Sequence, residues 1–118
     1  MHVKQIYSDM LKKYSDDIEE ILSLLHRAPV DKGDIARARE LFKALKQRLD
    51  SDYREGQSEK SRSLLSEIDL RYYRPAVESA HSLLKLKANS TPDQRWIVGL
   101  TAARDEINHY RDLLEKGY

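Results

Sequence analysis

The stretch VKQIYSDMLKKYSDDIEEILSLLH, residues 3–26, repeats large apolar side chains every three or four positions. Residues at that spacing lie on one side of an α-helix, because one turn takes about 3.6 residues. The remaining positions are mostly polar or charged, so the stretch predicts an amphipathic helix that ends at Ala28-Pro29-Val30. The predicted buried stripe consists of Val3, Tyr7, Met10, Tyr14, Ile18, Ile21 and Leu25.

A second amphipathic helix is predicted after this break. Asp31 offers a carboxylate that can cap the first turn, and Glu55-Gly56-Gln57 ends the helix. Arg39, Lys43 and Lys46 lie away from its apolar face. That face consists of Ile35, Ala38, Phe42, Leu45 and Leu49.

A third helical segment is predicted over residues 58–87, with Pro75 in its middle. Proline has no N–H group, and its ring clashes with the carbonyl four residues earlier, here that of Arg71. The segment should therefore kink at Pro75 or split into helices over 58–73 and 75–87. Its predicted inner face consists of Leu65, Ile68, Tyr72, Ala76, Ser79, Leu83 and Leu86.

A fourth helix is predicted after a turn at residues 88–90. Thr91 can cap it, Pro92 suits its first position and Gln94 can close a capping box. Gly117 should end it. Its predicted buried face consists of Trp96, Leu100, Ala103, Ile107, Tyr110 and Leu114.

Four amphipathic helices with short connections predict one all-α domain, residues 1–118, built as an up-down four-helix bundle with the third helix kinked or split at Pro75. Hydrophobic residues make up 40% of the chain and charged residues 35%, a balance that excludes a disordered chain and a membrane protein. The absence of cysteine excludes disulfides and thiolate chemistry. The net charge of +1 gives no global attraction for nucleic acid.

The localisation that we expect is cytoplasmic. No apolar run approaches the ~20 residues that cross a bilayer. The first residues, Met1-His2-Val3-Lys4-Gln5, lack the apolar block of a signal peptide.

One motif in the fourth helix matches a known chemistry. Arg104 is followed by Asp105 and, after three more residues, by His109. This pattern resembles the signature of the HEPN family, small helical bundles that include metal-independent ribonucleases. The resemblance implies that His109 acts as general base on a ribose 2′-hydroxyl, that Arg104 holds the phosphate and that Asp105 orients one of them. Residues five apart on a helix lie some 140° apart, so Arg104 and His109 would meet at a shared groove, as in a dimer.

Two Glu-x-x-His units, Glu78–His81 and Glu106–His109, resemble half of a di-iron carboxylate site. Glu40, with Glu19 or Glu20, would have to supply the other ligands. A metal pair needs its ligands in the core, whereas the first unit belongs to a stripe that we expect to be solvated. We therefore predict neither a metal site nor a cofactor. The stripe consists of Glu67, Arg71, Arg74, Glu78, His81 and Lys85.

His81 also resembles the exposed histidine of histidine phosphotransfer bundles, because Lys85 follows it by four residues. Those bundles have a glycine that opens space around the ring, and this chain has none there. An ordinary exposed helix histidine is the preferred interpretation of His81.

A candidate binding surface consists of Arg71, Tyr73 and Arg74, which the bend at Pro75 would present to a partner. The simpler interpretation has the arginines in solvent and Tyr72 in the core. The chain holds 7 tyrosines against 1 phenylalanine and 1 tryptophan, and tyrosine is common at half-wet boundaries such as subunit contacts. We therefore expect a homo-oligomer rather than a monomer.

The sequence predicts a small helical module that binds another macromolecule. The expected partner is another protein or a second copy in a homodimer, and no membrane binding is expected. The alternative is a HEPN-like domain that binds RNA or cleaves it without a metal, using Arg104 and His109. Whether the protein is an enzyme is left open at this point.

Overall fold

A computed structural model describes residues 3–27 and 30–117, and every regular element in these ranges is helical. The predicted all-α class is confirmed. Ala28 and Pro29, where the first helix was predicted to end, lie outside the described residues. A π-helical turn at Asp69–Tyr73 precedes α4, and a 3₁₀ turn at His81–Lys85 follows it. The α-helices are α1 (Val3–Leu25), α2 (Lys32–Glu55), α3 (Glu59–Ser63), α4 (Arg74–Ala80) and α5 (Gln94–Lys116).

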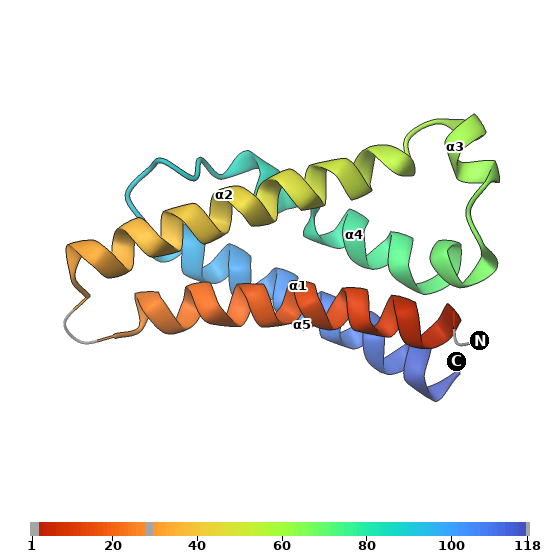
Figure 1. Ribbon diagram of the computed structural model, residues 1–118, viewed down its shortest axis with the longest axis horizontal. Helices are drawn as coiled ribbons and strands as arrows, with labels where there is room; N and C mark the ends of the chain where they lie inside the picture. The colour runs from red at the N-terminus through yellow and green to blue at the C-terminus, as the bar shows by residue number, and fades with distance from the viewer. Residues whose placement is uncertain (1–2, 28–29, 118) are drawn as a thin grey trace.

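Successive long segments run in opposite directions (Figure 1). Helix α1 packs against α2 and α5, and α4 packs against the same two helices from the other side. The start of α1 lies beside the end of α5, where Lys4 Nζ donates to the carbonyl of Glu115 at 3.1 Å. The short helix α3 stands at this same end (Figure 1). No helix in the described part of the chain is long and apolar enough to cross a membrane.

The predicted stripes of α2 and α5 are largely confirmed. The first turns of α1 differ from the prediction, because Val3 and Met10 are exposed. On the third segment Ser79 is exposed as well, although it was predicted to face inward. The rings of Phe42 on α2 and Trp96 in the first turn of α5 meet edge to face, with centroids 4.4 Å apart. The predicted residues that are buried are Tyr14, Ile18, Ile21, Ala38, Phe42, Leu45, Leu49, Tyr72, Ala76, Leu83, Trp96, Leu100, Ala103, Ile107 and Leu114.

The third segment was predicted to kink or split at Pro75; its helical path continues through the proline, and the distortion lies directly before it. The chain leaves the helix at residues 64–66 instead, between α3 and the π-helical turn. The distortion at Pro75 takes the form of that turn, which ends with the N–H of Arg74 donating to the carbonyl of Asp69. A π-helical turn links residues five apart, so it widens the helix immediately before the proline.

Three of the four described helix ends that the sequence predicted agree with the structure, among them the end of α2 at Glu55. Asp31 caps α2, and Asp34 completes the capping box. Gly117 ends α5 in the left-handed region, at φ 77°. The start of α5 is corrected, because Asp93 rather than Thr91 caps it by accepting from the N–H of Arg95 at 2.9 Å.

Replacing Gly99 by alanine is expected to stabilise the protein by about 0.5 kcal/mol, since alanine is favoured over glycine in a helix interior by about 1 kcal/mol. The added Cβ would lie 3.2 Å from Cδ1 of Leu86, which offsets part of the gain. Leu86 and Gly99 border a recess, so that methyl group has room to move. Urea unfolding of the Gly99→Ala variant checks this, and a loss above about 1 kcal/mol would show that the contact is rigid.

Candidate functional site

The predicted binding surface of Arg71, Tyr73 and Arg74 is corrected by the structure. Tyr73 and Arg74 are buried in the bundle, so they cannot form an accessible surface, and Arg74 does not belong to a solvated stripe. Arg71 alone is exposed, and its guanidinium lies 3.7 Å from Glu67. The buried pair belongs to a polar cluster that joins α1, α2 and α4.

Arg74 is the most deeply buried charge of this cluster, with no exposed side-chain surface. Its Nε donates to Oδ1 of Asp69 at 3.0 Å and its Nη2 to Oδ2 at 3.2 Å, a bidentate pair. Its Nη1 donates to the backbone carbonyl of Asp52, and Glu55 lies 3.7 Å away. A Cβ on Gly56 would lie 2.5 Å from Cδ of Arg74, so the arginine needs the glycine beside it.

Asp52 is the second centre of the cluster. The hydroxyls of Tyr14 and Tyr73 both donate to its Oδ2 at 2.5 Å. Burial, followed by the hydrogen bond to Asp52, raises the pKa of Tyr14 above its ordinary value. Burial, followed by the proximity of Tyr14, raises the pKa of Tyr73 as well. Both hydroxyls therefore keep their protons over the neutral range, and the cluster is a structural junction of three helices.

The structure places Arg104 beside Asp105 and Glu19 rather than beside His109. Arg104 Nη1 donates to Oε1 of Glu19 at 2.7 Å, and its Nε and Nη2 donate to Oδ1 of Asp105 at 3.1 Å. These contacts, Glu19 first, raise the pKa of the guanidinium. His109 is exposed, and its ring meets that of Tyr110 at 5.4 Å. Within one chain, no hydrogen bond joins Arg104 to His109 among the described residues.

The residues of the other motifs lie in ordinary helix contacts. Glu78 lies 3.4 Å from the guanidinium of Arg62. The ring of His81 is half-buried and stacks on that of Tyr53, with centroids 3.9 Å apart. In residues 3–27 and 30–117, no three histidine, aspartate or glutamate side chains gather as metal ligands would.

An apolar surface lies at the end of the molecule that carries the start of α1. Val3, Ile6 and Met10 are 43%, 47% and 37% exposed, and they follow one another at helical spacing on one side of α1. Leu64, which follows α3, is 82% exposed. The turn after α3 lies against α1, since Ser66 Oγ donates to the hydroxyl of Tyr7 at 3.4 Å.

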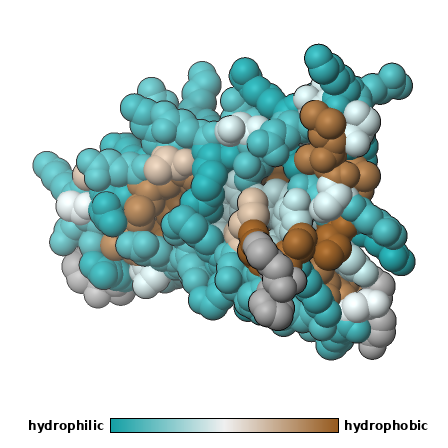
Figure 2. Space-filling model, turned by 45° about the vertical axis from the view of Figure 1, so that its right-hand side comes forward, coloured by the Kyte–Doolittle hydropathy of each residue, from teal (hydrophilic) through white to brown (hydrophobic). Residues whose placement is uncertain are grey.

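These four side chains, Val3, Ile6, Met10 and Leu64, are here called the apolar end surface. Figure 2 shows hydrophobic side chains gathered on this half of the molecule. The described residues hold six large hydrophobic side chains that are exposed, and four of them belong to this surface. Sequence periodicity assigned Val3 and Met10 to the core, because it cannot tell whether a neighbouring element covers an apolar face.

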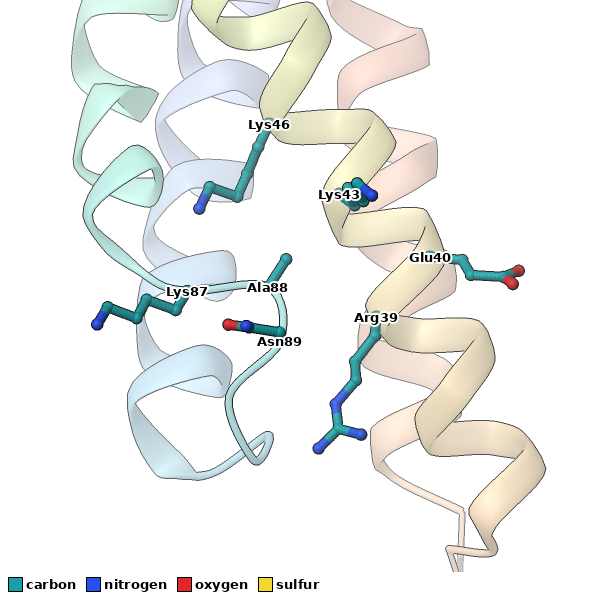
Figure 3. Close-up of a pocket in the computed structure, with 7 residues that line it drawn as sticks. All are labelled: Arg39, Glu40, Lys43, Lys46, Lys87, Ala88 and Asn89. Carbon is teal, nitrogen blue, oxygen red and sulfur yellow. The ribbon is translucent and has the colours of Figure 1, made fainter.

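A recess of about 450 Å³ lies between α2 and the 86–93 connection that leads into α5 (Figure 3). Four positive side chains and one carboxylate line it, which gives a local net charge of +3 in a chain whose total is +1. The sequence placed the α2 cations off the apolar face, but it could not show that residues 87–89 lie across from them. The residues that line this cationic pocket are Arg39, Glu40, Lys43, Lys46, Lys87, Ala88 and Asn89.

Comparisons with protein families, with curated proteins and with solved structures found no match for this chain. The apolar end surface and the cationic pocket are two candidate sites that the geometry of the described residues offers. They lie toward opposite ends of the molecule, since the pocket adjoins the connection into α5 whereas the apolar surface adjoins α3 (Figure 1).

Proposed function

We propose that this all-helical domain is an up-down four-helix bundle that works as a protein-interaction module, and that its apolar end surface binds an amphipathic helix of a partner protein. The observation that carries the proposal is the exposure of Val3, Ile6 and Met10 on one side of α1, together with the exposure of Leu64 in the turn that contacts α1 through Ser66. Exposed apolar patches of this kind mark interaction sites on soluble proteins.

The shape of the surface favours a helix as the occupant. Val3, Ile6 and Met10 span about two helical turns, which is the length over which a docked helix presents its anchors at i, i+3 and i+7. The turn after α3 contacts α1 through Ser66 and Tyr7 and exposes Leu64, so we expect a helix laid along α1 to extend toward Leu64.

The size of the surface favours a partner protein over a second copy of this chain. Four partly exposed side chains make a patch on the order of a few hundred Å². A stable homodimer needs about 800 Å² on each subunit. The expected complex is therefore a reversible one, in which a short helix supplies the matching apolar face.

The test compares single charge substitutions inside and outside the surface. Ile6→Glu and Leu64→Glu place a carboxylate within it, whereas Val98→Glu makes the same kind of change at a 57% exposed position on α5. Proteins captured by the wild type are identified by mass spectrometry, and the one lost with the first two variants is purified and titrated. We expect its affinity to fall at least ~10-fold for Ile6→Glu and Leu64→Glu and to stay unchanged for Val98→Glu.

Two results would contradict this proposal. One is a partner that binds all three variants equally, because its site then lies elsewhere. The other is a wild type that is dimeric at micromolar concentration by light scattering and becomes monomeric in Leu64→Glu, because the surface then binds a second copy.

The RNA-cleaving alternative has less support from the geometry. A phosphate bound by Arg104 would have to share the guanidinium with Glu19 and Asp105, whose carboxylates accept from three of its five N–H groups and repel an anion. Labelled RNA incubated in EDTA with the wild type, Arg104→Ala and His109→Ala tests it directly. Cleavage by the wild type that both variants lose would replace the interaction module with a nuclease.

A further inference from the structure

The cationic pocket carries a local excess of positive charge, because four cationic residues and one acidic residue line it. In Figure 3, Arg39 and Lys46 extend from α2 toward the 86–93 connection, whereas the carboxylate of Glu40 extends away from it. Four cations line the recess, and in Figure 3 the ammonium of Lys87, like the carboxylate of Glu40, extends away from the space between α2 and the connection. Like charges brought together repel one another, so the pocket favours a ligand of opposite charge.

Two of the cations also shape the pocket. Arg39 Nε donates to the carbonyl of Ser90 at 3.1 Å, and Lys46 Nζ donates to the carbonyl of Leu86. Because these bonds fix the connection against α2, the opposite walls of the pocket are held in place before any ligand arrives. A preorganised site loses less conformational entropy on binding than a flexible one.

The remaining donors have no protein partner among the described residues. Arg39 keeps its two terminal nitrogens, and the ammonium groups of Lys43 and Lys87 make no hydrogen bond or ion pair in residues 3–27 and 30–117. A guanidinium presents two parallel N–H groups to two oxygens of one phosphate, and lysine ammonium groups contact phosphate oxygens as point charges. The pocket thus offers donors for more than one phosphate group.

The form of the pocket indicates a small ligand. Its volume of about 450 Å³ lies within the range of small-molecule sites, roughly 300–1,000 Å³. No aromatic side chain lines it, so an unpaired base has no ring on which to stack as single-stranded nucleic acid requires. We propose that the cationic pocket binds a small ligand that carries two or more phosphate groups, recognised through those groups.

The experiment is a calorimetric titration of the whole chain with inorganic triphosphate at low salt, beside a titration with orthophosphate. Lys43→Gln/Lys87→Gln removes two cations of the pocket that hold no protein contact, so the fold should be unaffected. Lys13→Gln/Lys60→Gln changes the net charge equally at exposed positions outside the pocket. We expect triphosphate affinity to fall at least ~10-fold in the first double variant and less than ~2-fold in the second.

A third variant is expected to retain or increase the affinity for triphosphate rather than lower it. Glu40→Gln removes the acidic residue of the lining, so triphosphate should bind it at least as tightly as the wild type. Equal losses in both lysine variants, equal affinity for orthophosphate and triphosphate, or no binding by the wild type would each overturn the proposal. Tighter binding of a short single-stranded RNA through the same lysines would also overturn it, in favour of a nucleic-acid backbone.

Discussion

Replacing Arg74 by methionine is expected to destabilise the protein by about 3–5 kcal/mol. The substitution keeps an apolar stem of similar length but leaves the carboxylate of Asp69 buried without its bidentate partner. The backbone carbonyl of Asp52 loses a donor as well. Domains of this kind are stable by about 5–15 kcal/mol, so the variant should lose a large share of its stability. Urea unfolding followed by circular dichroism measures the loss.

The matched control removes both charges together. Arg74→Met/Asp69→Leu leaves no buried ion, and replacing both partners of a buried pair by apolar groups is often nearly neutral. We therefore expect the double variant to be more stable than Arg74→Met alone, by at least about 1 kcal/mol. Two results would contradict this prediction: a loss of stability below about 1 kcal/mol in Arg74→Met, or a loss in the double variant equal to the sum of the losses in the two single variants. Either would mean that the Arg74–Asp69 pair is not a coupled, stabilising interaction.

The π-helical turn explains why the sequence did not reveal this pair. Asp69 and Arg74 are five residues apart, and on a regular α-helix such residues face directions about 140° apart. The π-helical turn before Pro75 closes between residues five apart and so brings the two side chains to the same side. Arg104 and His109 have the same spacing on the uninterrupted helix α5, where Arg104 is held by Glu19 and Asp105 instead.

Local periodicity predicted what depends on neighbouring residues in the chain. It gave the four helical regions, the cap at Asp31 and the end of α5 at Gly117, because these follow from spacing and from backbone preference. The predicted cap of α5, Thr91, was wrong by two residues, because Asp93 is the N-cap in the structure. Aspartate is a stronger N-cap residue than threonine, so two possible caps two residues apart left the helix start ambiguous.

The candidate surfaces depend on contacts between distant segments, which spacing does not encode. Met10 continues the stripe of Tyr14 and Ile18, but no element of the described chain fully covers it at the end of the bundle. Lys43 and Lys87 are 44 positions apart in the printed sequence, and only the path of the 86–93 connection across α2 places them in one pocket. The sequence shows the side chains of both surfaces, but it does not show that they lie together.

The hydroxyl pair on Asp52 predicts a steep loss of stability in alkaline solution. Burial raises the pKa of Tyr14 and Tyr73 in the folded protein, whereas tyrosine in an unfolded chain titrates near pH ~10. Below pH ~10 both states keep the protons, and the stability that the cluster contributes is complete. Above pH ~10 the unfolded state releases protons that the folded state retains, so the free energy of unfolding falls as pH rises.

The slope of that fall is the measurable quantity. Each tyrosine that stays protonated in the folded state lowers the free energy of unfolding by about 1.4 kcal/mol per pH unit, or about 2.8 kcal/mol for the two. Urea unfolding at pH 9, 10 and 11 measures the slope, and ultraviolet absorbance of tyrosinate follows the ionisation itself. Tyr14→Phe should reduce the slope by about 1.4 kcal/mol per pH unit, because phenylalanine has no proton to lose.

Tyr110→Phe provides the control for this prediction. Tyr110 lies against His109 on α5, and its hydroxyl makes no hydrogen bond in the described part of the chain, so this variant removes a tyrosine hydroxyl without touching the contact with Asp52. Equal slopes in the wild type and Tyr14→Phe would mean that the hydroxyl of Tyr14 ionises as easily in the folded protein as in the unfolded chain. The contact with Asp52 would then be open to water, and the ion pair of Arg48 with Asp17 would remain the polar link between α1 and α2 near Tyr14.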